Sequence, residues 1–158
     1  MSSSLGLCVL ALCALMCVAA AHAQTAAQTS ILRAYGVVGD AIAASLTGQA
    51  GDPARGARLM QQRQKSLCVL CHSGPFPDPH LQGTIAPDLT GIGSRLSAAQ
   101  LRLRIVDMKR LNPQSIMPTY YSAPIESGAR VAANWRGKPI LDAEEIEDLV
   151  AYLQTLKQ

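Results

Sequence analysis

The chain has few aromatic residues, with one Trp, four Tyr and one Phe among its 158 positions. It also lacks a dense basic tract interleaved with aromatic side chains, which argues against a nucleic-acid-binding protein. No stretch alternates apolar and polar residues with a period of two, so the sequence predicts no β-sheet. An all-helical protein is therefore expected, and its core has few large flat side chains to pack.

Cysteine is absent between residues 18 and 67 and again after residue 71. Three of the five cysteines lie in the apolar run "LGLCVLALCALMCVAAAHA", which ends in Ala-His-Ala at residue 23. This run predicts a signal peptide over residues 1–23, although no Lys or Arg precedes it. A retained membrane anchor is the alternative, but the apolar part is short for a span of about 20 residues. Cleavage leaves residues 24–158 as one exported domain with no membrane span.

Charge is unevenly distributed along the expected mature chain. Residues 24–138 contain 13 basic and 6 acidic side chains, a net charge of +7. Residues 139–158 contain 1 basic and 5 acidic side chains, a net charge of −4. This polarity suits docking to an acidic protein face or binding of an anionic substrate.

Three or four helices are expected. Residues 31–46 have helical character, which Gly36 and Gly39 interrupt. Asp52 as N-cap and Pro53 at the first helical position predict a helix over residues 53–67 that leads directly into the next cysteine.

The second half of the chain contains two clearer helices. Ser97 and Gln100 form a capping-box pattern at the start of residues 97–111. Residues 141–158 combine Asp142 as N-cap with acidic residues in the first turn and an apolar stripe. Proline and glycine predict that the segments before and between these helices, residues 73–94 and 112–124, are ordered loops.

The sequence Cys68-Val-Leu-Cys71-His72 contains the pattern C-x-x-C-H. Two cysteines are too few for a disulfide scaffold, and this spacing suits a redox disulfide, half of a zinc site or covalent haem attachment. Zinc typically needs four ligands, and His80 is the only other histidine after residue 23. A thioredoxin-like site requires a βαβ setting. We favour haem, which both thiols would bind as thioethers and whose iron His72 would ligate; the porphyrin would also supply the flat apolar body that the aromatics do not.

A second axial ligand can come from Met60, Met108, Met117 or His80. Met60 and Met108 lie in predicted helices, where methionine is usually core. Met117 lies in the loop "SIMPTYY", which two prolines stiffen, and it is the favoured ligand, with an ordinary core residue as the alternative. His/Met ligation raises the reduction potential and suits electron acceptance.

The ring N–H of His72 needs an acceptor if the other nitrogen binds iron. The carbonyl of Pro87, in "TIAPDLTG", is the candidate. The alternative is that Pro87 only shapes the loop.

The segments "CVLCH", "GTIAPDLTGIG" and "IMP", followed by a C-terminal amphipathic helix with Tyr152, occur in this order in class I cytochromes c, which the chain resembles along its mature length. The resemblance implies an all-α fold of three to four helices and long loops around one covalent haem c. It also implies that the N- and C-terminal helices cross closely at a glycine, with Gly56 and Tyr152 at the matching positions.

A closer resemblance, over residues 36–158, is to the SoxX family, on "GDAIAASLTG", "APDLTGIGSRLSAAQLRLRIVDMKRLNPQSIMPTYY" and "GKPILDAEEIEDLVAYLQTL". It implies the monohaem subunit of a periplasmic heterodimer, SoxAX, an L-cysteine S-thiosulfotransferase that joins thiosulfate to a cysteine of a sulfur-carrier protein. Bond-making is then expected on the SoxA partner. This chain would carry no catalytic residue and would pass electrons to a small cytochrome.

Two other functions stay open, a free-standing electron shuttle and a haem sensor with an open iron site. Tyr120, Tyr121 and Trp135 are candidates for lining the haem or a partner contact. Five basic residues are a candidate surface for thiosulfate or an acidic partner, with an ordinary solvated face as the alternative: Arg95, Arg102, Arg104, Lys109 and Arg110.

Overall fold

The computed structural model describes residues 32–122, 132 and 135–157, so the predicted signal peptide lies outside the described residues. These residues form helices and loops, with one isolated bridge between Val38 and Ala41 and no strand in the described ranges. The all-α prediction is confirmed. The helices are α2 (Pro53–Met60), α3 (Cys68–Cys71), α4 (Ile92–Arg95), α5 (Ala98–Asp107) and α6 (Ala143–Thr155), with 3-10 turns η1 (Pro79–Leu81) and η2 (Met108–Arg110).

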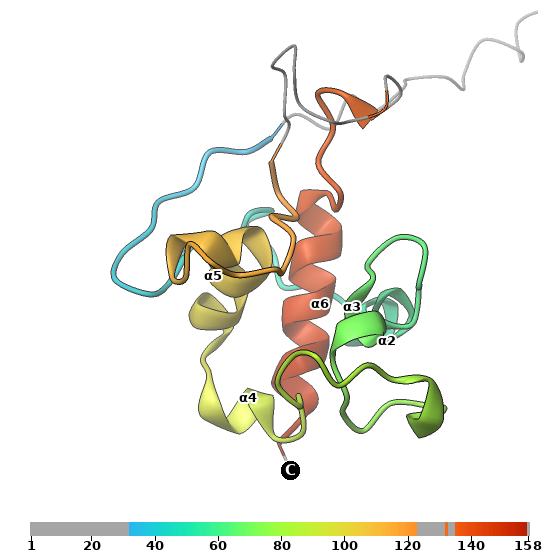
Figure 1. Cartoon of the computed structure of the whole chain (residues 1–158). Helices are drawn as coiled ribbons and strands as arrows, with labels where there is room; N and C mark the ends of the chain where they lie inside the picture. The colour runs from blue at the N-terminus through green and yellow to red at the C-terminus, as the bar shows by residue number, and fades with distance from the viewer. Residues whose placement is uncertain (1–31, 123–131, 133–134, 158) are drawn as a thin grey trace, which may run out of the picture.

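Helix α6 runs through the centre of the molecule, and α2, α4 and α5 pack against it (Figure 1). Its apolar stripe is buried at Ile146, Leu149, Val150 and Leu153, and each such side chain contributes about 1.5–3 kcal/mol when fully buried. Its first turn is closed by a capping box between Asp142 and Glu145. No helix in the described part of the chain is long and apolar enough to span a bilayer.

Helices α2 and α6 cross closely because Gly56 has no side chain. A Cβ atom at Gly56 would lie 2.0 Å from the carbonyl oxygen of Asp148 and 2.8 Å from Cβ of Tyr152. Only glycine fits such a backbone approach. The expected pairing of Gly56 with Tyr152 is therefore present.

The predicted helix over residues 31–46 is wrong, because the described part of this segment is extended and turning chain. Gly39 has a φ of 59°, which breaks a helix. The backbone is bound instead by two buried side chains of distant helices. Arg102 donates to the carbonyl of Ile42 at 2.7 Å, and Glu147 accepts from the amide of Leu46 at 2.9 Å.

The helix predicted over residues 53–67 ends at Met60. Beyond it, the amides of Lys65, Ser66 and Leu67 all donate to the carbonyl of Gln62, which forms a compact turn. Leu67 adopts the left-handed region, with φ 62°, immediately before α3. This turn, and not a continuous helix, delivers the chain to Cys68.

The basic residues do not form one exposed face, which corrects the hypothesis of a common docking surface. Arg102 is buried and makes two hydrogen bonds to Glu147, at 2.7 and 2.8 Å. Arg104 contacts Asp40 at 3.3 Å. Arg102 therefore stabilises the fold, because removing one partner of a buried ion pair leaves an uncompensated charge.

Candidate functional site

Helix α3 places Cys68 and Cys71 on the same side of a single turn, since residues three apart are neighbours on a helix. Both side chains are half-buried free thiols. His72 follows at the end of the helix, where its amide donates to the carbonyl of Cys68 at 2.9 Å. The three predicted residues are thus brought together at the surface of the core.

The imidazole of His72 is oriented by the backbone of the following loop. Its Nδ1 lies 2.7 Å from the carbonyl oxygen of Pro87. A carbonyl only accepts, so this contact places the proton on Nδ1 and leaves the lone pair on Nε2. The hydrogen bond expected from the sequence is therefore present, and Nε2 is the nitrogen available to a metal ion.

A series of hydrogen bonds fastens this loop alongside α3. The amides of Gly83, Ala86 and Leu89 donate to the carbonyls of Val69, Cys71 and Ser73 at 2.9, 3.0 and 2.9 Å. The approach is so close that a Cβ at Gly83 would lie 2.0 Å from the carbonyl oxygen of Leu70. The Pro87 carbonyl is held at the ring of His72 by this backbone pairing.

Asp88 adds a side-chain link that the sequence analysis missed. Its carboxylate accepts from the Ser73 hydroxyl at 2.6 Å and from the Thr90 amide at 2.7 Å. These hydrogen bonds, with that from Ser73 the largest cause, lower the pKa of Asp88 to about 2. An aspartate two residues before its amide donor is a turn pattern that could have revealed half of this arrangement.

Cys68 packs against the hydrophobic core. Burial raises the pKa of its thiol. A thioredoxin-like site requires a βαβ setting, and the described residues contain no strand. No group of three His, Cys, Asp or Glu side chains within the described ranges is arranged to hold a metal ion, which leaves the zinc alternative without its donor set there.

The four candidates for a second axial ligand differ in burial and in the element that carries them. Met60 is fully buried inside α2, as expected for a core residue. Met108 is partly buried at the start of η2, and His80 is exposed on η1. Met117 lies on a loop and packs partly buried against the hydrophobic core. Its amide donates to the Ser115 hydroxyl at 3.2 Å.

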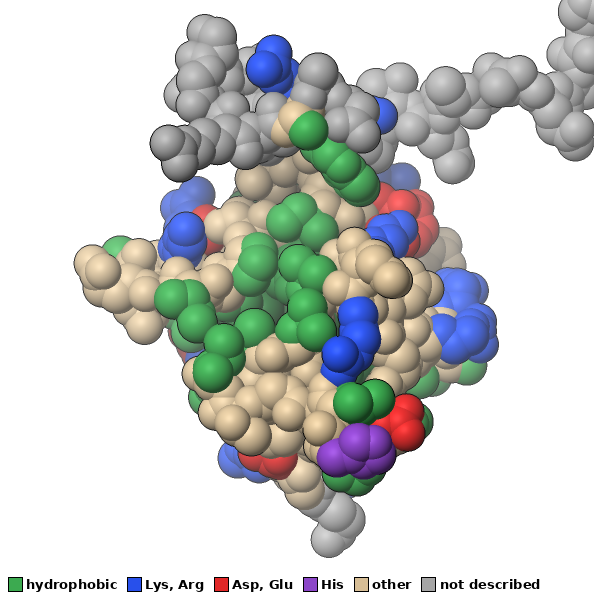
Figure 2. Space-filling model, turned by 45° about the vertical axis from the view of Figure 1, so that its right-hand side comes forward, with side chains coloured by type: hydrophobic (Ala, Val, Ile, Leu, Met, Phe, Trp, Pro, Cys, Tyr) green, Lys and Arg blue, Asp and Glu red, His purple; other side chains and the backbone are tan. Residues whose placement is uncertain are grey.

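An apolar surface is present for a flat cofactor. In Figure 2 the side of the molecule that carries α3 comes forward, and apolar side chains gather around a hollow on this face. Two thiols on one turn, an imidazole with a free Nε2 and an apolar hollow fit a covalently attached haem.

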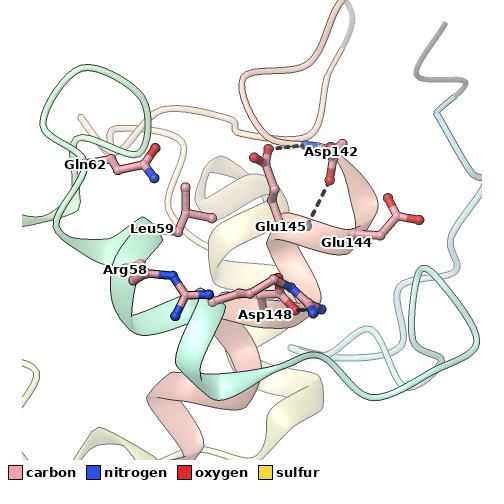
Figure 3. A pocket seen from close by; sticks show the side chains of 8 residues that line it. Arg58, Leu59, Gln62, Asp142, Glu144, Glu145 and Asp148 are labelled. Atoms are coloured by element: carbon pink, nitrogen blue, oxygen red, sulfur yellow. Dashed lines mark hydrogen bonds and ion pairs between the residues drawn. The ribbon is translucent and has the colours of Figure 1, made fainter. Parts of the chain in front are cut away.

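A second hollow lies elsewhere, between α2 and the start of α6, with a volume of about 310 Å³ (Figure 3). Basic and acidic side chains both line it, and it contains none of the predicted haem-binding residues. Asp142 and Glu145 in its wall are already bound to each other as the cap of α6.

Comparison with known proteins decides the family. The profile of the family Cytochrome c matches residues 53–157, more than half of the chain. The chain belongs to the cytochrome c family. Membership implies a covalently bound haem c, in agreement with the C-x-x-C-H sequence on α3.

One solved structure refines this placement. A chain in the crystal structure of SoxXA from P. pantotrophus is 39% identical to this cytochrome, with a TM-score of 0.69. The match covers 78% of this cytochrome and 95% of that chain. No curated protein matches it. The resemblance to a SoxX-like cytochrome is thus confirmed.

Proposed function

We propose that the protein is the electron-transfer haem c subunit of a SoxAX-type complex, with one haem held by Cys68, Cys71, His72 and Met117. The observation that carries the proposal is the C-x-x-C-H turn, whose His72 ring is fixed by Pro87, in a chain 39% identical to a chain of SoxXA. Haem supplies a one-electron couple between ferrous and ferric iron.

The chain's own residues have separate tasks in this assignment. Cys68 and Cys71 bind the porphyrin edge as thioethers. His72 would ligate the iron through Nε2, while the Pro87 carbonyl accepts a hydrogen bond from the proton of Nδ1 and keeps the ring oriented. Met117, on a loop stiffened by Pro113 and Pro118, would supply its sulfur as the second ligand. Methionine ligation keeps the potential high enough to accept electrons.

The partner chemistry fits an electron-accepting subunit. Joining thiosulfate to a carrier cysteine forms one sulfur–sulfur bond and releases one proton and two electrons. With Cys68 and Cys71 consumed as thioethers, residues 24–158 retain no thiol to take part in that bond. Bond-making then belongs to the SoxA-like partner, and this subunit accepts the electrons one at a time and passes them to a small cytochrome.

Three exposed apolar residues near the ligands in the sequence are candidates for the contact with the SoxA-like partner. Leu70, between the two cysteines, is 42% exposed, and Ile116, next to Met117, is 74% exposed. Ile85, two residues before Pro87, is 70% exposed. We propose these three positions as the first at which to test that contact.

The experiment is co-purification of the tagged holoprotein with its SoxA-like partner from the native periplasm, followed by size-exclusion chromatography and haem staining. A one-to-one complex is expected. Ile116→Glu should weaken it without changing haem content, because a charge replaces an apolar contact. Val38→Glu is the control, since Val38 is 78% exposed in the N-terminal segment, away in sequence from every ligand. A protein that stays monomeric in the presence of its partner would favour the shuttle.

We also propose that the protein is exported to the periplasm. Residues 1–23 act as a signal peptide, and residues 24–158 form the cytochrome domain in the periplasm. N-terminal sequencing of the purified protein should begin at Gln24, and a sequence that begins at the initial residues would contradict cleavage.

A further inference from the structure

Two adjacent tyrosines of the Met117 loop are equally buried but bind different parts of the molecule. Tyr120 and Tyr121 are each 3% exposed. The Tyr121 hydroxyl accepts from the amide of Arg33 at 2.8 Å, and its ring packs against Tyr35 with centroids 6.2 Å apart. The Tyr120 hydroxyl donates to the carbonyl of Ser66, 54 residues earlier in the chain.

Ser66 belongs to the turn over residues 62–67 that directly precedes Cys68. Ser66 is fully buried, and its hydroxyl donates to the carbonyl of Leu59 at 2.6 Å. The next residue, Leu67, has the strained φ of 62°. Such a conformation persists only where the surroundings hold it. The hydrogen bond from Tyr120 is one of the interactions that hold it.

The same carbonyl also accepts from the thiol of Cys68, at 3.4 Å. A thioether has no S–H, so this second donor is lost when haem is attached. Of the two side-chain donors, Tyr120 then remains. The hydrogen bond from Tyr120 to Ser66 is therefore the contact that persists in the holoprotein.

Only two residues separate Tyr120 from Met117, and both are constrained. Pro118 fixes its own φ, and the Thr119 hydroxyl donates to the carboxylate of Asp107 at 3.0 Å. Because the two intervening residues have little conformational freedom, a displacement of Tyr120 also displaces Met117. Burial also raises the pKa of the Tyr120 phenol, which keeps it a neutral donor.

We propose that Tyr120 is a positioning residue: its hydroxyl ties the loop that carries Met117 to the turn that carries Cys68, and so sets the position of the methionine sulfur relative to a haem bound at Cys68. This rests on the proposed function, because it assigns Met117 to the iron.

The test compares Tyr120→Phe with Tyr121→Phe in the purified holoprotein. Each variant loses one buried hydroxyl from adjacent positions. The rate at which cyanide replaces the methionine ligand is measured from the visible spectrum, together with the reduction potential. A hydrogen bond of this kind contributes about 0.5–1.5 kcal/mol, so Tyr120→Phe should accelerate replacement roughly 2- to 10-fold and shift the potential.

Tyr121→Phe should leave both quantities at the wild-type values, because its hydroxyl holds the N-terminal segment and not the turn before Cys68. Wild-type rates and potential in Tyr120→Phe would overturn the proposal. Equal changes in both variants would overturn it as well, since they would show a general effect of buried hydroxyl loss.

If Tyr120→Phe accumulates poorly, a second pair of variants is compared instead. Leu67→Gly removes the steric cost of the turn, because glycine adopts a positive φ freely. The double variant Leu67→Gly with Tyr120→Phe is compared with Leu67→Gly alone, and faster cyanide replacement in the double variant supports the proposal. Equal rates overturn it.

These outcomes are distinguishable from failure of the proposed function. Haem attachment is measured independently by mass spectrometry of the wild type. Attached haem with no effect of Tyr120→Phe refutes the role of Tyr120 alone, whereas a wild type without haem refutes the proposed function and the role of Tyr120 together.

Discussion

The two regions that carry the candidate iron ligands are built differently. Around His72, hydrogen bonds cross between two backbone segments, residues 69–73 and 83–89. Around Met117, the described hydrogen bonds made by the amides of residues 114–117 stay within the loop, as from Met117 to Ser115. The loop is instead fixed by side chains that follow Met117 within it, beginning with Thr119 and Tyr120. His72 is therefore held by the backbone, whereas Met117 depends on side chains that substitutions can change.

The largest expected effect is on the His72 side. Cys68→Ser should leave one thioether at best and should yield little holoprotein, because one of the two covalent bonds to the porphyrin is lost. Haem staining of a denaturing gel, normalised to protein, measures the loss, with Cys71→Ser as the companion variant. Full haem content in Cys68→Ser would show that the α3 turn does not attach haem through both cysteines.

The next largest effect is on the stability of the fold, at the close crossing of helices α2 and α6. Gly56→Ala should destabilise the protein by about 3 kcal/mol, because its Cβ collides with backbone that cannot move aside. Thermal unfolding measures this. Gly36→Ala is the control, because a Cβ there meets no atom within 4 Å. Equal unfolding temperatures for the two variants would contradict the close crossing.

Met117→Ala should leave haem attached but remove sulfur from the iron, in contrast to the cysteine variants. The reduction potential should fall, on the order of 100 mV, within the wide range that axial ligands control. Spectroelectrochemical titration and carbon monoxide binding to the reduced protein measure both consequences. Met108→Ala should change neither. A spectrum of Met117→Ala that still shows sulfur ligation would assign the ligand to another residue.

The smallest expected effect is the acid dependence contributed by Asp88. Its pKa in the folded protein is lowered to about 2, so its stabilising contribution is present above the ordinary pKa of 3.8 and is lost as the pH falls toward about 2. Asp88→Asn should lower the unfolding temperature at neutral pH, and its difference from wild type should shrink below pH 4.

Asp78→Asn, on an exposed loop residue whose side chain makes no capping hydrogen bond, is the control for Asp88. Unfolding temperatures measured from pH 7 to pH 2 test the expectation. A difference between Asp88→Asn and wild type that stays constant over this range would contradict the assigned role of the ionised carboxylate.

The parts of the fold that the sequence predicted are those that local signals determine. The capping boxes of α5 and α6 are present at Ser97 and Asp142, where a few neighbouring residues satisfy the first amides. The need of His72 for an acceptor made the Pro87 carbonyl a candidate, with a loop-shaping role as the alternative, and the structure shows the hydrogen bond. The order of motifs, from C-x-x-C-H to the methionine loop, was enough to place the family.

The parts that the sequence did not predict depend on partners far along the chain. Residues 32–46 are not helical because Arg102 and Glu147 bind their backbone from helices about 60 to 100 positions later. The sequence suggests a surface position for Arg102, whereas in the structure its guanidinium is paired with Glu147. The link from Tyr120 to Ser66 spans 54 positions and leaves no local pattern.

The central claim is that the α3 turn holds one haem by two thioether bonds. Mass spectrometry of the exported, purified protein tests it most directly, with proteolysis to isolate the peptide that contains residues 68–72. The predicted result is the mass of the mature polypeptide plus one haem, with the added mass confined to that peptide. A polypeptide of unmodified mass, with both cysteines free or joined as a disulfide, would contradict the account.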